Sequence, residues 1–408
     1  MAKIFIEEST LSAIGDSIRA KTGKTDMIPP LNMPAEIASI QTGGGAYPSA
    51  KWNDVTFIDY DGSVLYSYSL EEAQTLTKLP ALPTHDGLVC QGWNWTLEAI
   101  IALNRPVTVG AMYITDDGAT RLHIRIATVG RMTVPLYIGQ TVANGVSIDW
   151  GDGSAAETLA GTGNVNTSHA YAEPGDYTIS LMPEDGCTLS FGSSSSSHCV
   201  IGSNKDNDRV YCTMLKEVSI GKNVTSISGY AFQRCYTLVS IAIPDSVTSI
   251  SSYAFEDCKS LVSITIPDSV TSISSYAFES CNVLSCITIP GSVTSISSNA
   301  FQYCYSLSRI TIQDGVKYID RVALANCYAL VSIAIPDSVI YINSNAFANC
   351  YAMRYYDFSA CTDIPSLLKT DAFNGIPSDC QMLIPAALFD AWSTETNWAT
   401  YASKMVAV

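Results

Sequence analysis

A 23-residue unit that recurs between residues 217 and 353 constrains the fold of this chain more than any other feature. Residues 249–271 read SISSYAFEDCKSLVSITIPDSVT, and residues 272–294 repeat that text with few changes. A single unit of this length buries almost no apolar surface alone, whereas stacked units share one core and pair their strands at about 4.8 Å per step. The repeat therefore predicts a solenoid.

Columns of apolar residues at this step define the interior. Isoleucines two residues apart, such as Ile264 and Ile266, lie on one face of a strand, and Val247 and Ile250 begin a second inward column. Two further columns consist of Phe232, Phe255, Phe278, Phe301, Leu324 and Phe347, and of Cys235, Cys258, Cys281, Cys304, Cys327 and Cys350.

The pattern IxIPDSVTSIxxxAFxxCxxL, over residues 217–353, resembles the BspA-like leucine-rich repeat. The resemblance implies a right-handed solenoid with one short strand per turn, a role in adhesion or ligand binding, and no catalytic residues. In the fifth repeat Gln313 replaces the proline and Leu324 the phenylalanine, so we expect a local irregularity there.

The sequence contains 13 cysteines, of which six occur once per repeat. We interpret them as reduced and as a buried packing column. A metal-binding role is the alternative, but zinc requires four ligands that converge on a point, and a step of 23 residues gives a line.

The whole chain is expected to be mainly β and multi-domain. Residues 1–45 predict short helices, residues 46–104 a hairpin module with Trp93 or Trp95 buried, and residues 105–192 a sandwich. The solenoid follows over residues 193–384, with Phe373 in a last degenerate turn. Residues 385–408, a helix with Leu388, Phe389 and Trp392 and then Trp398 and Tyr401, form an expected end cap.

Two of these modules resemble known families. The strand–turn–strand text VTFIDYDGSVLYSYSL, with the later paired prolines and GW, resembles the β-grasp-like repeat of internalin-type surface proteins, which implies a spacer or adhesion unit. WGDGS at residues 150–154, followed by HAYAEPGDYTISL, resembles a polycystic-kidney-disease-type domain, an immunoglobulin-like sandwich. That resemblance implies that Tyr171 and Tyr177 pack in its core.

Asp149 and Asp152 flank the Gly-Asp-Gly turn of that segment. Their carboxylates have the chemistry to bind a cation, and they also have the chemistry to form a turn, which we favour.

The positions that the core leaves free carry many tyrosines. Rigid amphipathic rings beside asparagine suit binding sites and sugar rings, whereas the alternative is that they only cap the loops between turns. The candidate ligand-binding residues are Tyr230, Tyr236, Tyr253, Lys259, Tyr276, Asn282, Asn299, Tyr305, Tyr328 and Tyr351.

Composition excludes several classes of function. The net charge of −16 opposes nucleic-acid binding, and no run approaches the roughly 18 apolar residues of a membrane span. The four histidines form no nucleophile–base pattern, so we expect no enzyme and no cofactor or metal. We also expect no secretion signal or surface anchor.

The opening ESTLSAIGDSIRAKTGKTDMIPPLNMPAEIASI resembles an N-terminal segment of tail and baseplate-associated proteins of phages that infect Gram-positive bacteria. It implies that residues 1–45 attach to a phage tail or baseplate, through the apolar stripes of Leu11, Ile14, Ile18, Ile37 and Ile40.

The sequence thus favours a phage receptor-binding or tail-fibre protein that binds a bacterial cell-surface glycan or protein. By analogy it is a homo-oligomer, with a trimer favoured, that assembles in the host cytoplasm and acts outside it on the virion. The alternatives are a structural spacer of a phage-like particle and a bacterial adhesin exported by an unusual route.

Overall fold

The computed structural model describes residues 55–58, 64–84, 88–93, 97–101, 107–115, 117–127, 131–192, 198–203, 211–262 and 264–408. The interface predictions on Leu11, Ile14, Ile18, Ile37 and Ile40 lie outside these residues, as does Trp95. The described chain is mainly β, as the sequence predicts.

A small mixed sheet comes first, in the strand order β2-β1-β4-β3. The predicted hairpin is present as an antiparallel pair, and Trp93 is buried with its indole nitrogen donating to the Pro80 carbonyl at 2.9 Å. The elements are β1 (Val55–Ile58), β2 (Val64–Tyr68), α3 (Leu70–Gln74), β3 (Leu88–Trp93), α4 (Leu97–Ile101) and β4 (Val107–Thr115).

The sequence analysis ends this module at residue 104, but β4 lies beyond that boundary and pairs in parallel with β1, from Val55 opposite Val107 to Ile58 opposite Gly110. The physical reason is that Val109 and Ala111 on β4 belong to the same buried cluster as Val55 and Phe57 on β1. The apolar face of β1 is therefore completed by a strand that the sequence analysis assigns to the next domain.

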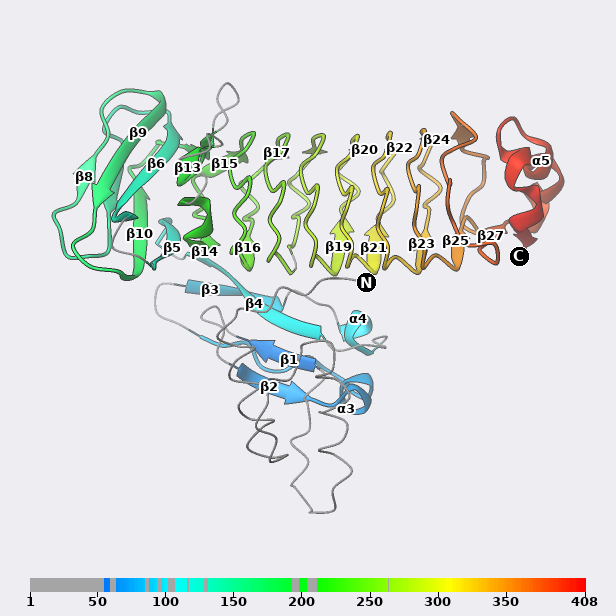
Figure 1. Cartoon of the computed structure of the whole chain (residues 1–408), viewed down its shortest axis with the longest axis horizontal. Coiled ribbons are helices and arrows are strands. Elements are labelled where there is room, and N and C mark those ends of the chain that lie inside the picture. Colours follow the sequence, from blue (N-terminus) through cyan, green and yellow to red (C-terminus); the bar gives the residue numbers. More distant parts are fainter. Residues whose placement is uncertain are drawn as a thin grey trace, which may run out of the picture. The chain divides into compact units, whose positions relative to one another are not determined.

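Two sheets follow, and both run from the segment at residues 120–191 into the repeats (Figure 1). The six-stranded sheet has the order β16 (Ser240–Ala242), β14 (Leu215–Ser219), β5 (Thr120–Ile126), β10 (Gly175–Pro183), β7 (Val146–Asp149) and β8 (Glu157–Thr158). The ten-stranded sheet has the order β26 (Ser366–Leu367), β24 (Tyr341–Ile342), β22 (Tyr318–Ile319), β20 (Ser295–Ile296), β18 (Ser272–Ile273), β17 (Ser249–Ile250), β15 (Val224–Ile227), β11 (Leu189–Phe191), β6 (Thr133–Gln140) and β9 (Gly163–Ala170).

One hydrophobic core extends through both parts. It runs from Leu122 and Ile124 on β5, through Phe191 and Phe232, to Trp398 near the C-terminal end. The join is made by β14 against β5 and by β11 against β15, so the strands of residues 120–191 cover the first face of the solenoid. The boundary expected at residues 192/193 is a point where the core continues without interruption.

Each turn of the solenoid contributes strands on two faces, not the one short strand per turn that the resemblance implies. One face is the ten-stranded sheet, and the other is built from the isoleucine pairs. The second column is a strand because residues such as Ser249 and Ile250 pair in register with Ser272 and Ile273 one turn later. The strands of the isoleucine face are β16, β19 (Cys286–Ile289), β21 (Arg309–Ile312), β23 (Ser332–Ala334), β25 (Tyr355–Asp357), β27 (Gln381–Ile384) and β28 (Met405–Ala407).

The fifth repeat does not show the expected irregularity. Ile296, Ile319 and Ile342 pair in sequence across it, and Leu324 is buried in the phenylalanine column. Leucine fills enough of that place to keep the step, and the exposed Gln313 side chain accepts a hydrogen bond from the Gly291 N–H at 3.1 Å.

The C-terminal residues close the last turn. Strand β28 pairs in parallel with β27, and Trp392, Trp398 and Tyr401 are buried over the final core layer. The short elements here are η4 (Ala386–Leu388), α5 (Phe389–Thr394) and η5 (Trp398–Lys404), and near the first turn β12 (His198–Cys199), β13 (Gly202–Ser203) and η3 (Tyr211–Thr213). Along the described part of the chain, no helix combines the length and the hydropathy needed to cross a bilayer.

Candidate functional site

The cysteine column is a packing and hydrogen-bonding element. In each turn from Cys258 to Cys350 the thiol donates to the carbonyl oxygen of the phenylalanine column one turn earlier, at 3.1 to 3.4 Å. Burial raises the pKa of these thiols, to about 12 for Cys304 and Cys350, which keeps them protonated and unreactive. Among the described residues no group of three or more His, Cys, Asp or Glu is arranged to hold a metal.

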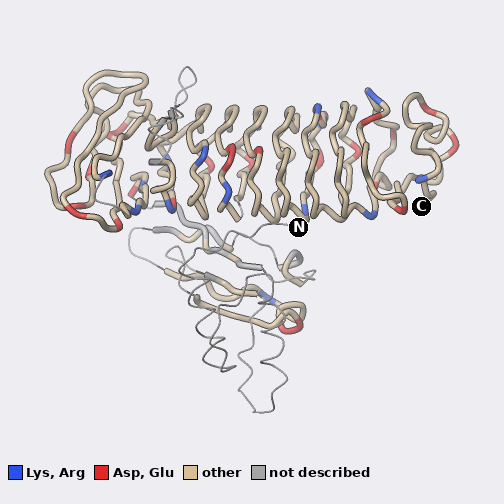
Figure 2. Tube along the Cα trace, in the orientation of Figure 1, with Lys and Arg blue, Asp and Glu red and all other residues tan. Residues whose placement is uncertain are grey.

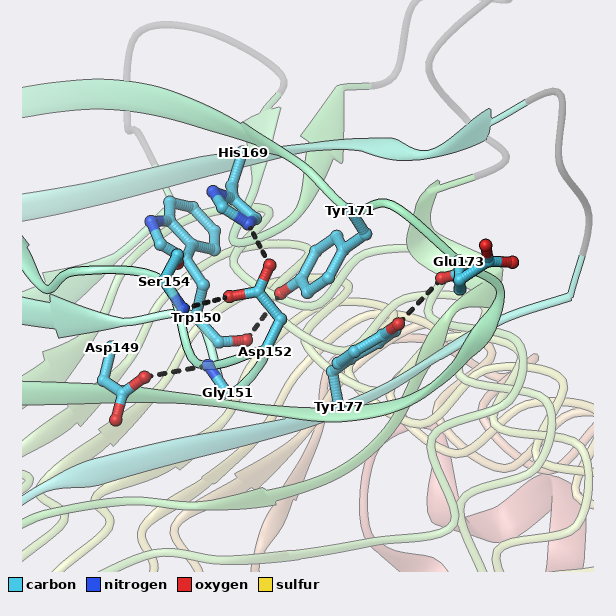
Figure 3. A network of polar contacts seen from close by, with 9 residues as sticks. All are labelled: Asp149, Trp150, Gly151, Asp152, Ser154, His169, Tyr171, Glu173 and Tyr177. Carbon is cyan, nitrogen blue, oxygen red and sulfur yellow. Dashed lines mark hydrogen bonds and ion pairs between the residues drawn. The ribbon is translucent and has the colours of Figure 1, made fainter.

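The Gly-Asp-Gly turn is held by its own carboxylates (Figure 3). Asp149 accepts from the Gly151 N–H at 2.9 Å, and Asp152 accepts from the Ser154 N–H at 3.0 Å and contacts His169 Nε2 at 2.7 Å. Hydrogen bonds from Ser154 and His169 hold the pKa of Asp152 well below its usual range. These contacts support the turn-forming role of both aspartates.

Aromatic rings pack beside this turn. Tyr171 is buried and donates its hydroxyl to the Trp150 carbonyl at 2.9 Å, and the Tyr177 ring lies 4.2 Å from it, centre to centre (Figure 3). Trp150 stacks on His169 at 4.9 Å. The rings therefore brace the turn from within the core of residues 120–191.

The first tyrosine ladder consists of Tyr230, Tyr253 and Tyr276, whose rings stack at 5.0 and 4.7 Å with interplanar angles of 2° and 6°. All three have a left-handed backbone, with φ between 63° and 65°. That region costs about 1–2 kcal/mol for a residue with a Cβ and is better tolerated by asparagine. Asn299 and Asn345 occupy the same column, with φ of 61° and 53°.

The second tyrosine ladder consists of Tyr305, Tyr328 and Tyr351, stacked at 4.9 and 5.2 Å. Their exposed fractions are 40%, 40% and 57%. Tyr351 ends this ladder and is the most exposed of the three. The rings stand on the loops that follow each cysteine, where the preceding core column fixes the position of every loop.

The other candidates in that column are committed to neighbours. Lys259 Nζ lies 4.9 Å from the centre of the Tyr236 ring and 3.5 Å from Asp257 Oδ1. In the orientation that satisfies its hydrogen bonds, the Asn282 amide donates to the carbonyls of Tyr303 and Ser280. The structure thus brings the candidate residues together as two ladders with a polar segment between them.

Two features of this surface have a sequence signal that the sequence analysis does not use. Tyr318 and Tyr341, also 23 residues apart, stack at 4.7 Å on the outer face of the ten-stranded sheet, and the Tyr341 hydroxyl donates to Asp320 at 2.9 Å. Glu256 and Glu279 form an acidic step of the same spacing between the first ladder and the phenylalanine column.

Glu279 gives a prediction for pH dependence. Burial, followed by repulsion from Glu256 and Asp257, raises its pKa to about 7. The folded state therefore prefers the protonated carboxyl, and this contribution to stability is complete below the ordinary pKa of 4.5 and is lost as the pH rises through about 7.

The substitution Glu279→Gln should raise the free energy of unfolding at pH 8 by about 1 kcal/mol and leave it unchanged at pH 4, because the half-buried carboxyl is partly screened by solvent. Thermal unfolding at the two pH values measures this, as a rise of about 2 °C at pH 8 only. Asp268→Asn, at an exposed position, is the control; an equal shift in both variants would contradict the prediction.

The fold defines a leucine-rich-repeat solenoid. Residues 204–262 and 225–354 match the family described as BspA type leucine rich repeat region, in six copies. The match confirms the repeat family for this part of the chain and not for the segments before it.

Solved structures similar to this chain are also leucine-rich-repeat proteins. A leucine rich cell surface protein from Faecalibacterium prausnitzii is 30% identical, with a TM-score of 0.29, over 43% of this chain and 62% of that one. The T. pallidum leucine rich repeat protein is 23% identical, with a TM-score of 0.37, over 48% and 85%. A leucine-rich repeat protein from Eubacterium ventriosum is 24% identical, with a TM-score of 0.34, over 38% and 42%. This chain thus spans less than two thirds of the first of these proteins. A search of curated proteins gives no match.

Proposed function

We propose that this chain is a phage tail-associated binding protein and not an enzyme. Residues 1–45 attach it to the virion, and the solenoid binds a glycan or protein on the bacterial surface. The observation that carries the binding part is the second tyrosine ladder, three exposed rings held at fixed spacing on a continuous core.

Stacking determines what this ladder offers a ligand. Within the ladder each ring covers the face of its neighbour, so the ligand meets ring edges and phenol hydroxyls that repeat every 4.9 to 5.2 Å along the solenoid. Such a row suits a linear polymer with regularly spaced hydroxyl groups. The end ring, Tyr351, adds an outer face suited to a sugar ring.

The surroundings of the ladder favour an uncharged ligand. The loops that carry the second ladder also carry Asn326 and Asn349, whose amides bond to each other at 3.0 Å, and Tyr303. Most of the solenoid trace is free of charge (Figure 2). A neutral glycan therefore fits this region better than an anionic one.

The first ladder supports the same reading through its backbone. Because Asn299 and Asn345 satisfy the same left-handed position, the fold does not require tyrosine at residues 230, 253 and 276. Three bulky residues kept at a cost of about 1–2 kcal/mol each are consistent with a use for their rings.

Attachment rests on the resemblance of residues 1–45 to tail and baseplate-associated segments. A homotrimer formed through this segment would present three ladders to one surface and raise avidity without new contacts. The chain would assemble in the host cytoplasm and act outside it, on the virion tail.

Binding of the full chain to intact Gram-positive cells and to their purified cell-wall polysaccharides tests the proposal. Replacing Tyr305, Tyr328 and Tyr351 together with serine should weaken binding on the order of 100-fold, at roughly 1 kcal/mol for each ring. The matched control is Tyr318→Ser with Tyr341→Ser, which removes a stacked pair from another face and should leave binding within about 2-fold.

A second candidate, a structural spacer of a phage-like particle, is favoured by the unbroken core, which makes residues 120–408 suitable as a stiff connector. If the full chain binds no cell or polysaccharide above background, the spacer is the better reading. If it binds but never joins a particle through residues 1–45, the bacterial adhesin is.

A further inference from the structure

Three thiols converge where the strands of residues 120–191 pass into the first turn of the solenoid. Cys199, Cys212 and Cys235 are each at most 1% exposed, and Cys199 Sγ lies 2.7 Å from Cys212 Sγ. A disulfide bond is about 2.05 Å long, so the backbone already places these two sulfur atoms within about 0.7 Å of bonding distance.

This pair differs from the cysteine column. In the column each thiol is occupied by a carbonyl one turn away, whereas Cys199 and Cys212 contact each other. Hydrogen bonds from the Cys199 and Cys235 thiols, with the nearby Arg234 guanidinium, lower the pKa of Cys212 to about 5. Cys212 is therefore the nucleophile of the three at neutral pH.

We propose that Cys199 and Cys212 form a disulfide when the protein leaves a reducing compartment and meets a peroxide. The Cys212 thiolate attacks hydrogen peroxide, the O–O bond breaks, and a sulfenic acid forms with release of hydroxide, which takes up a proton as water. The Cys199 thiol then attacks that sulfur, losing its proton, and the S–O bond breaks to release a second water. The two thiols together lose two electrons and two protons, and the peroxide is reduced to water.

The position of the bond gives it a mechanical role. The segment of Cys199 connects both parts, because the Val200 carbonyl accepts from Tyr137 on β6 and its N–H donates to Ala231 in the first turn, both at 2.8 Å. The segment of Cys212 does the same.

In that second segment the Met214 carbonyl accepts from Arg125 on β5 at 2.8 Å, and the Thr213 carbonyl accepts from the Thr237 hydroxyl in the first turn at 2.6 Å. A covalent link between the two connecting segments would close a loop between residues 13 apart in the sequence and hold the junction of the two sheets together. This role is independent of which ligand the ladders bind.

The test uses the full chain with Cys90→Ser and Cys286→Ser, since these two cysteines are the partly exposed ones of the 13 and would otherwise link molecules. This background keeps 11 cysteines. After hydrogen peroxide treatment and denaturation, the count of free thiols should fall from 11 to 9, and peptide mapping without reductant should recover one peptide joining Cys199 to Cys212. The thermal midpoint should rise by a few degrees and return after reduction.

Two variants separate this bond from its alternatives. Cys235→Ser keeps the pair and should still lose two thiols, whereas Cys212→Ser should lose none and gain no thermal stability from peroxide. The mapping on the background chain needs neither variant to fold. The proposal is overturned if all 11 thiols survive, if Cys212 is instead linked to Cys235, or if Cys212 is oxidised to a sulfinic acid with Cys199 left as a thiol.

Discussion

A chain that starts at residue 198 is expected to aggregate, and a chain that starts at residue 117 is expected to remain soluble and folded. The longer chain keeps β5 against β14 and β11 against β15. The shorter one exposes the edges of both solenoid strands together with the apolar layer on which Phe191 contacts Phe232, at 5.9 Å between ring centres. Unpaired edges beside an open apolar face favour association.

Size-exclusion chromatography and light scattering of the two chains measure this difference. Residues 55–115 have a separate buried cluster, so their removal is the matched control for truncation itself. A monomeric 198–408 chain that unfolds cooperatively would show that the solenoid does not need the preceding strands as a cap.

Replacing Trp398 with alanine should destabilise the C-terminal end by about 3–5 kcal/mol. The indole is fully buried, lies 5.4 Å from the rings of Phe358 and Trp392, and donates its N–H to the Pro365 carbonyl at 2.7 Å. The substitution therefore leaves both a cavity and a carbonyl without its partner.

Urea unfolding followed by circular dichroism measures this loss. Trp398→Phe keeps most of the volume and loses mainly the hydrogen bond, so it should cost about 1 kcal/mol for the bond and a further amount for the smaller ring. Leu368→Ala, at a position that is 42% exposed, should change stability little. Equal losses in Trp398→Ala and Leu368→Ala would mean that the tryptophan does not close the core.

The interior of the solenoid could be predicted almost residue by residue. Phe278, Cys281 and Ile287 recur at a step of 23, and each is buried, because a repeat that stacks on itself places equal residues at equal depth. Local substitutions such as Leu324 do not change this, since a neighbouring turn on each side holds the register.

The surface could be predicted only as a set of residues. The sequence shows that Tyr305, Tyr328 and Tyr351 are in register, but stacking of their rings follows from side-chain directions and from the distance between turns. In consequence, ring edges and hydroxyls replace ring faces as the main surface offered to a ligand. The contact between Cys199 and Cys212 has no periodic signal and was not expected.

By itself the sequence determined the step, the inward columns and the cap at the C-terminal end, because periodic burial and terminal tryptophans are local properties of the text. Tertiary structure decided that β4 completes the first sheet and that residues 120–191 share the core of the solenoid. Those outcomes depend on pairing between strands far apart in the chain, such as β5 with β14 and β1 with β4, where the edge of one strand is satisfied by a partner that no local pattern identifies.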